Sequence, residues 1–236
     1  MFKNVAIPES VLSIAMESFS SVVTDKVEMA LECIIVDPNN PNYKSEDGVL
    51  YSKDGKILIR YPASKSDKSF IMPEGVTTVE SFAFSDNENL ESITIPNSVL
   101  SIGRCVFRRN TALKNVKIPD SVMVIGYSAF SGCTSLKNAT LSNKMETISL
   151  ELFYNCSSLE SIIIPDSVKT IGNWAFYNCS SLNNIVVPKN VIELYDNTFR
   201  GCSQLTVYCQ ANSSPNTWDA LWTYYVKEVI WGYKGE

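Results

Sequence analysis

Apolar residues recur along this chain with a period of 23 residues, and every period has the same internal order. A proline closes a short apolar alternation in each one, and these prolines are Pro73, Pro96, Pro119, Pro165 and Pro188. Ser142 stands where a further proline would keep the count. A fixed period of this length indicates one supersecondary unit stacked on copies of itself, so we predict a repeat solenoid rather than a globule.

The alternation before each proline has the form I-x-I, as in Val116 to Ile118 and Ile162 to Ile164. Alternation of this kind directs the outer two side chains into a core and the middle one to solvent, which is typical of a β-strand. Proline then ends the strand, because it lacks the N–H that a continuing ladder requires. Copies of this strand, one per coil, predict a parallel β-sheet along one face.

A second apolar run follows each proline. Four of its residues have the spacing of one face of a two-turn helix or 3₁₀ segment, namely Ile125, Ala129, Phe130 and Cys133. Positions 132, 155, 178 and 201 hold Gly or Asn, the residue types that accept the left-handed conformation at a helix end, whereas Asp86 and Arg109 occupy this place in earlier coils and fit it less well. We therefore expect short helices or turns on the face opposite the sheet.

The period predicts how the chain is organised. We assign 1–209 to the solenoid and 210–236 to a C-terminal capping segment, in which Trp218, Trp222 and Trp231 would bury the open end of the stack. Residues 37–69 are interpreted as a coil that carries an inserted β-hairpin around Asp54-Gly55. In the first coil, the closing apolar residues from Leu31 to Val36 come six residues late.

Composition and charge exclude several classes of function. The chain has 236 residues, of which 45% are apolar, and a net charge of −5, so it is expected to fold and to bind no nucleic acid. No apolar run approaches the ~18 residues of a membrane span, and no membrane insertion is expected. The chain lacks histidine, a glycine-rich phosphate loop and any C-x-x-C pair. We therefore predict no catalytic residues, no cofactor and no metal site.

The cysteines follow the period. Four of them form one column, Cys133, Cys156, Cys179 and Cys202, and the two preceding coils have Asn87 and Asn110 in this position. The position therefore accepts a small buried side chain that can bond to a loop backbone. Cβ vectors in stacked coils run parallel and do not converge as a disulfide requires, so we predict reduced thiols.

The repeat phrase resembles the BspA-like class of leucine-rich repeats. It reads IPDSVMVIGYSAFSGCTSLKNA at 118–139 and IPDSVKTIGNWAFYNCSSLNNI at 164–185, and the hairpin VLYSKDGKILIRYP and the ending WGYKGE are similar to further elements of this class. The resemblance implies a leucine-rich-repeat-like right-handed coil, with a parallel β-sheet on the concave face and short helices or turns on the convex face. It also implies a secreted or surface-attached bacterial protein that acts in adhesion. It supplies no residue-level site.

A candidate partner-binding site comes from the middle residue of each strand. These residues form one outward column: Ile71, Thr94, Lys117, Thr140, Ile163, Val186 and Tyr208, with Ala6 and Ile35 at the N-terminal end. Only Lys117 is charged, and a contiguous apolar stripe on a surface often marks a partner site. The alternative is that β-branched residues simply suit strands. A parallel polar column, Ser92, Asn115, Asn138, Ser161 and Asn184, could supply contacts beside the stripe.

These observations leave two functions open. The first is a non-catalytic binding or adhesion module that recognises a protein or glycan across the strand face. The second is a structural spacer within a larger surface protein. Trp218, Asp219 and Trp222 could alternatively form a sugar-binding platform instead of a cap. The chain begins inside a repeat-like phrase at Val5–Ile7 and without a signal-peptide pattern, so we expect a piece of a longer protein whose exposed edge strand could pair with a second copy.

Overall fold

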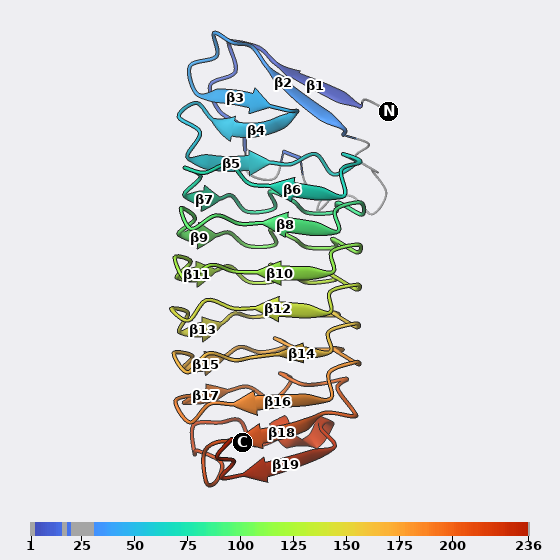
Figure 1. Ribbon diagram of the computed structural model, residues 1–236, viewed down its shortest axis with the longest axis vertical. Coiled ribbons are helices and arrows are strands. Elements are labelled where there is room, and N and C mark those ends of the chain that lie inside the picture. Colours follow the sequence, from blue (N-terminus) through green and yellow to red (C-terminus); the bar gives the residue numbers. More distant parts are fainter. Residues whose placement is uncertain (1–2, 16–17, 20–30, 236) are drawn as a thin grey trace.

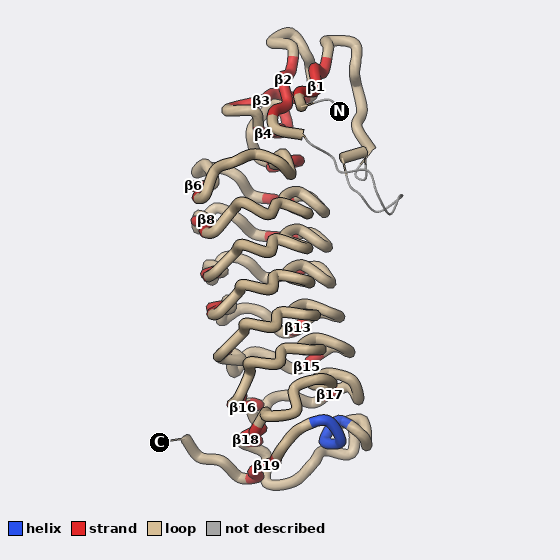
Figure 2. The backbone as a smooth tube through the Cα atoms, turned by 90° about the vertical axis from the view of Figure 1, so that its right-hand side faces the viewer, coloured by secondary structure: helices blue, strands red, loops and turns tan. Residues whose placement is uncertain are grey.

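The computed structural model describes residues 3–15, 18–19 and 31–235 of the chain. It is a β-solenoid of about eight turns with parallel strands, as the period predicted, and it has almost no helix. The coils stack in a nearly straight column, with the two termini at opposite ends (Figures 1 and 2). Each coil therefore contacts only the coil before it and the coil after it, so stability depends on repeated contacts between neighbours.

The predicted strand forms in every regular coil. One parallel sheet contains β6 (Ser69–Ile71), β8 (Ser92–Thr94), β10 (Asn115–Lys117), β12 (Asn138–Thr140) and β14 (Ser161–Ile162). A second sheet on the same side contains β16 (Asn184–Val187), β18 (Thr206–Cys209) and β19 (Glu228–Trp231). We call this side of the column the strand face. Pairing is in phase with the repeat, so that Lys117 lies opposite Thr140.

A further strand of two residues forms in each coil, which the sequence did not lead us to expect. These strands are β7 (Thr78–Val79), β9 (Ser101–Ile102), β11 (Val124–Ile125), β13 (Thr147–Ile148), β15 (Thr170–Ile171) and β17 (Glu193–Leu194). They pair in parallel, for example Val124 with Ser101 and Ile125 with Ile102. Two residues are too few for an alternating pattern to show in the sequence.

The helix or 3₁₀ segment expected after Ile125 does not form, and turns take its place. Ser128 and Gly132 have φ of 55° and 78°, the left-handed region, which interrupts a helix. The Phe130 N–H donates to the Leu152 carbonyl of the next coil at 3.0 Å, and the Gly132 N–H to that of Tyr154 at 2.7 Å. Since these N–H groups bond to the neighbouring coil, they cannot close helical turns within their own.

A ladder of aromatic rings runs through the centre of the column. Its members are Phe84, Phe107, Phe130, Phe153, Phe176 and Phe199, all fully buried. Consecutive rings are stacked with centroids 5.2–5.7 Å apart. Tyr61 stacks on the N-terminal end at 5.0 Å, and Trp222 meets the C-terminal end edge-on at 6.3 Å. The ladder therefore joins all regular coils and both ends of the column.

The cysteine column lies beside this ladder, fully buried. Each thiol donates to a phenylalanine carbonyl of the preceding coil at 3.0–3.2 Å, as Cys133 does to Phe107. Asn110 serves the same role, with its amide 2.8 Å from the Phe84 carbonyl. Burial raises the pKa of Cys133 and Cys202 to about 12. All seven cysteines are free thiols in the structure.

The N-terminal coils contain β1 (Asn4–Ile7), β2 (Cys33–Val36), β3 (Tyr43–Glu46), β4 (Val49–Ser52) and β5 (Ile57–Arg60). The predicted hairpin is confirmed, since β4 and β5 pair antiparallel across Asp54-Gly55. A second hairpin, β3 to β4, turns at Asp47-Gly48 and was not predicted. β1 pairs with β2 alone among the described strands. The six-residue delay falls within 20–30, and Met1 is likewise outside the described residues.

The C-terminal segment packs over the last coil. It contributes the 3₁₀ helix η2 (Trp222–Tyr225) and β19, which pairs with β18. Trp218 and Trp222 are buried, and their rings meet at 5.4 Å. Trp231 lies within 6.1 Å of both. Trp222 meets the last ring of the aromatic ladder, and Trp218 and Trp231 pack against Trp222.

Candidate functional site

The predicted outward column lies on the surface of the strand face for most of its length. Ile71 is 76% exposed and Ile163 is 83% exposed, which are unusually high fractions for isoleucine. Thr94, Lys117 and Thr140 are also exposed. Their strand neighbours are buried, or partly buried in the case of Phe70, because side chains alternate between the two sides of a strand. The structure thus places these five residues in one file, one per coil.

The C-terminal end of the column is less exposed. Val186 and Tyr208 are half-buried and lie opposite each other across β16 and β18. The Tyr233 ring lies 4.9 Å from the Tyr208 ring, and Ile230 continues the column on β19. Ile230 was not predicted as a member of the column, because the cap strand does not follow the 23-residue period.

A polar column runs alongside the apolar one and is internally hydrogen-bonded. The Asn138 amide donates to the Asn115 side-chain oxygen at 3.2 Å, and the Ser161 hydroxyl donates to the Asn138 oxygen at 3.2 Å. Beyond it, Lys114 and Glu91 form an ion pair at 2.5 Å. The exposed apolar file therefore has an ordered polar border on this side.

The strand face divides near Ile163. β14 ends at Ile162, and the sheet order places β14 and β16 in different sheets. Ile163 therefore follows the end of its strand, beside the division. Its exposed side chain lies at the middle of the column, between Thr140 and Val186.

Apolar exposure is not confined to the strand face. Leu100, Met123 and Val124 are 54–66% exposed at the entry to β9 and β11, on another side of the column. The aromatic side chain of Tyr127 is nearby in the chain and accepts a hydrogen bond from Arg104 at 2.7 Å. Leu100, Met123 and Val124 therefore form a second exposed apolar surface, with which the strand face can be compared.

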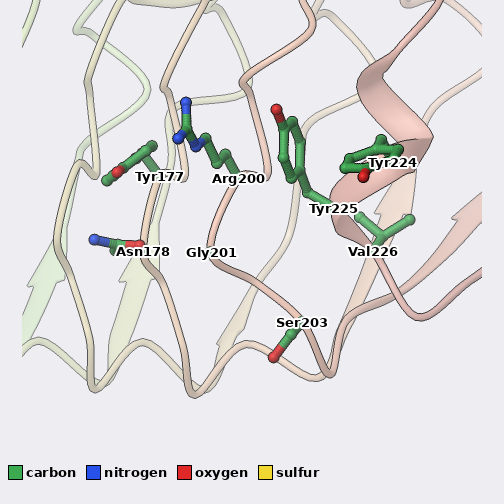
Figure 3. Close-up of a pocket in the computed structure, with 8 residues that line it drawn as sticks. All are labelled: Tyr177, Asn178, Arg200, Gly201, Ser203, Tyr224, Tyr225 and Val226. Carbon is green, nitrogen blue, oxygen red and sulfur yellow. The ribbon is translucent and has the colours of Figure 1, made fainter.

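A cleft of about 450 Å³ opens at the C-terminal end, on the turn side of the coils (Figure 3). It is lined by Tyr177, Asn178, Arg200, Gly201, Ser203, Tyr224, Tyr225 and Val226. This cleft was not predicted from the sequence, because its residues come from two successive turns and the cap. The sugar platform considered at Trp218 and Trp222 is ruled out, since both rings are buried in the core.

Catalytic and metal chemistry have few candidates here. Across residues 3–15, 18–19 and 31–235, no three side chains of the types His, Cys, Asp or Glu gather in a way that could hold a metal ion. In the same ranges, no helix has the length and apolar character needed to cross a membrane. Burial raises the pKa of the Cys156 and Cys179 thiols far above the ordinary value, which keeps them protonated and unreactive.

Comparison with known proteins identifies the repeat. The family description "BspA type Leucine rich repeat region" matches residues 63–157 and 101–216, in six copies. No curated protein sequence matches the chain. Three crystal structures are similar. A leucine-rich repeat protein from Eubacterium ventriosum is 28% identical with a TM-score of 0.80, and the alignment covers 99% of this chain and 60% of that one.

The other two structures show the same architecture at lower similarity. A leucine-rich cell surface protein from Faecalibacterium prausnitzii is 27% identical, with a TM-score of 0.60 and coverage of 99% and 52%. A leucine-rich repeat protein from Bacteroides ovatus is 25% identical, with a TM-score of 0.57 and coverage of 97% and 57%. This chain thus spans between about half and three fifths of the length of these relatives.

Proposed function

Because the chain belongs to the BspA-type leucine-rich repeat family, we propose that it is a non-catalytic recognition module that binds a protein or glycan partner across its strand face. Leucine-rich repeat proteins are generally non-enzymatic, and their domains generally mediate protein interactions. The binding surface in this proposal is the outward column from Ile71 to Tyr208 together with its polar border.

One observation carries the proposal. Ile71 and Ile163 expose about four fifths of their side-chain surface on a face where solvation would favour polar residues. The neighbouring amide and hydroxyl ladder supplies the polar rim that recognition surfaces combine with an apolar centre. The mechanism is surface complementarity, with desolvation of the apolar file and hydrogen bonds at its border.

We further propose an extracellular or cell-surface location and a role in adhesion. The support comes from the Faecalibacterium relative, which is described as a cell surface protein. The alternative function, a structural spacer, is favoured by the nearly straight stack, which holds its two ends apart (Figure 2). A spacer requires no exposed apolar file, whereas a binding module does.

Charge substitution on the column tests the binding proposal. We expect the double variant Ile71→Glu, Ile163→Glu to lose at least about tenfold in affinity for any partner found on arrays of immobilised extracellular-matrix proteins and of glycans, because both carboxylates would be desolvated on binding. These two positions are chosen over Val186 and Tyr208 because their exposure keeps the thermal transition unchanged. Surface plasmon resonance measures affinity, and circular dichroism measures the transition.

Met123→Glu is the matched control, since Met123 is 66% exposed on another side of the column. It should bind like the wild type. Equal affinity of the double variant and the wild type would reject the strand face as the site. A wild-type protein that binds nothing on either array would favour the spacer.

A further inference from the structure

A row of planar side chains ends in the C-terminal cleft. Tyr154, Tyr177 and Arg200 occupy equivalent positions, 23 residues apart, and Tyr225 of η2 continues the row. The Tyr154 and Tyr177 rings are stacked at 4.7 Å with an interplanar angle of 4°. The Arg200 guanidinium lies 5.9 Å from the Tyr177 centroid and 5.6 Å from that of Tyr225. Figure 3 shows Arg200 between these two rings.

Arg200 has two aromatic neighbours but no charged partner among the described residues. Its guanidinium is within cation–π distance of both the Tyr177 and the Tyr225 ring. Among the described residues it makes no ion pair, and no carboxylate lines the cleft. A planar cation with free donors favours a bidentate carboxylate. The cleft therefore offers a cationic group for an anion in a protein whose net charge is −5.

The rest of the lining is suited to a ring with one apolar face and several hydroxyls. Tyr224 is 79% exposed, and Val226 adds apolar surface beside it. Aromatic faces carry negative charge density, which attracts the C–H face of a sugar ring. Ser203 and the tyrosine hydroxyls supply donors and acceptors around the cleft.

Gly201 lets two successive turns pack closely at the cleft. Its φ is +87°, and a Cβ there would lie 2.0 Å from the Asn178 side-chain oxygen. The Asn178 amide nitrogen donates to Asn155 at 3.0 Å, which directs that oxygen toward Gly201. The space of about 450 Å³ is within the range of small-ligand sites.

From this arrangement we propose that the C-terminal cleft binds an acidic sugar residue, a six-membered ring that bears a carboxylate. The carboxylate pairs with Arg200, the apolar ring face packs against Tyr224, and the hydroxyls bond to Ser203 and the tyrosine hydroxyls. This site is separate from the strand face, because it is formed by the turns and the cap. Its ligand chemistry therefore does not depend on the strand-face proposal.

Titration with free sugars tests the proposal. N-acetylneuraminic acid and glucuronic acid are the probes, with galactose, glucose 6-sulfate and a tripeptide with a free carboxyl end as comparison ligands. Saturation-transfer NMR up to about 10 mM detects millimolar binding. We expect both acidic sugars to bind, galactose to bind at least about tenfold more weakly, and added salt to weaken the acidic sugars only.

Two variants separate ligand contact from folding. Arg200→Gln and Tyr224→Ala should each weaken acidic-sugar binding about tenfold with an unchanged thermal transition, since both side chains are exposed. Arg108→Gln is the matched control, because Arg108 occupies the same row four coils earlier, away from the cleft. Absence of acidic-sugar binding, equal binding of galactose, preference for the sulfated sugar or the tripeptide, or an unaffected Arg200→Gln variant would each overturn the assignment. Ile71→Glu, Ile163→Glu should leave this binding intact.

Discussion

Replacement of Phe153 by alanine is expected to lower the free energy of unfolding by about 3–5 kcal/mol. Phe153 is fully buried at the middle of the aromatic ladder, with the Phe130 and Phe176 rings at 5.5 and 5.6 Å. Its removal leaves a cavity that borders two neighbouring coils. Neither coil can close that cavity by itself, because strand pairing on both sides fixes the spacing of the coils.

Urea unfolding followed by far-ultraviolet circular dichroism measures this change. Ile192→Ala is a suitable control, since Ile192 is 54% exposed and surface truncations change stability by about 0.5 kcal/mol or less. A loss below about 1 kcal/mol for Phe153→Ala would mean that the rings do not form a continuous core.

Stability is expected to fall steeply as pH rises above about 9. The pKa of Cys133 and Cys202 is raised by burial from an ordinary 9.0 to about 12, so these thiols stay protonated in the folded protein and ionise in the unfolded chain. The unfolded state then binds fewer protons, so each such thiol lowers the free energy of unfolding by about 1.4 kcal/mol per pH unit between pH 9 and 12. Cys156 and Cys179 act in the same direction.

Cys133→Asn provides the matched control for the alkaline effect. Asn110 already fills the equivalent position one coil earlier and donates the same backbone hydrogen bond. The variant should keep its stability near pH 7. Above pH 9 its free energy of unfolding should fall less steeply with pH than that of the wild type, because one ionisable thiol is absent. Urea titrations at pH 7, 9 and 10.5 measure the slope, and a stability that does not change over this range would contradict the buried positions of the thiols.

Much of the fold was predictable because one pattern is repeated many times. Three features recur in successive coils: the alternation around Val116 and Ile118, the buried Phe130, and the asparagine or cysteine at position 133. A pattern that would be ambiguous in one coil therefore becomes clear when the coils are compared. The hairpin at Asp54-Gly55 was equally predictable, since two runs of alternating apolar residues flank a dipeptide that favours hairpin turns.

The turn side was interpreted less well. The spacing of Ile125, Ala129 and Phe130 fits a helix, but it equally fits two inward residues on a tight turn. Hydrogen bonds to the next coil favour the turn over the helix, as the bond from the Phe130 N–H to the Leu152 carbonyl shows. Because this partner is 22 residues away in sequence, no local pattern indicates the bond. The positive φ of Ser128 could not be predicted either, because serine has no strong preference for the left-handed conformation.

The strand face and the C-terminal cleft differ in how well the sequence predicts them, again because only the coils follow the period. Exposure of Ile71 and Ile163 follows from strand alternation and was predictable. The cleft around Arg200 depends on where η2 of the cap packs, and the cap does not share the period of the coils. Half-burial of Tyr208 has the same origin, since Tyr233 of the cap covers it.

Hydrogen exchange on the complex tests whether the strand face is the recognition surface. Amide exchange is measured by mass spectrometry with and without the partner recovered from the arrays. We expect slower exchange in the peptides that contain β6, β12, β14 and β16, and no change around Met123. Protection confined to the segment around Leu100 and Met123, with the strand-face peptides unchanged, would contradict it.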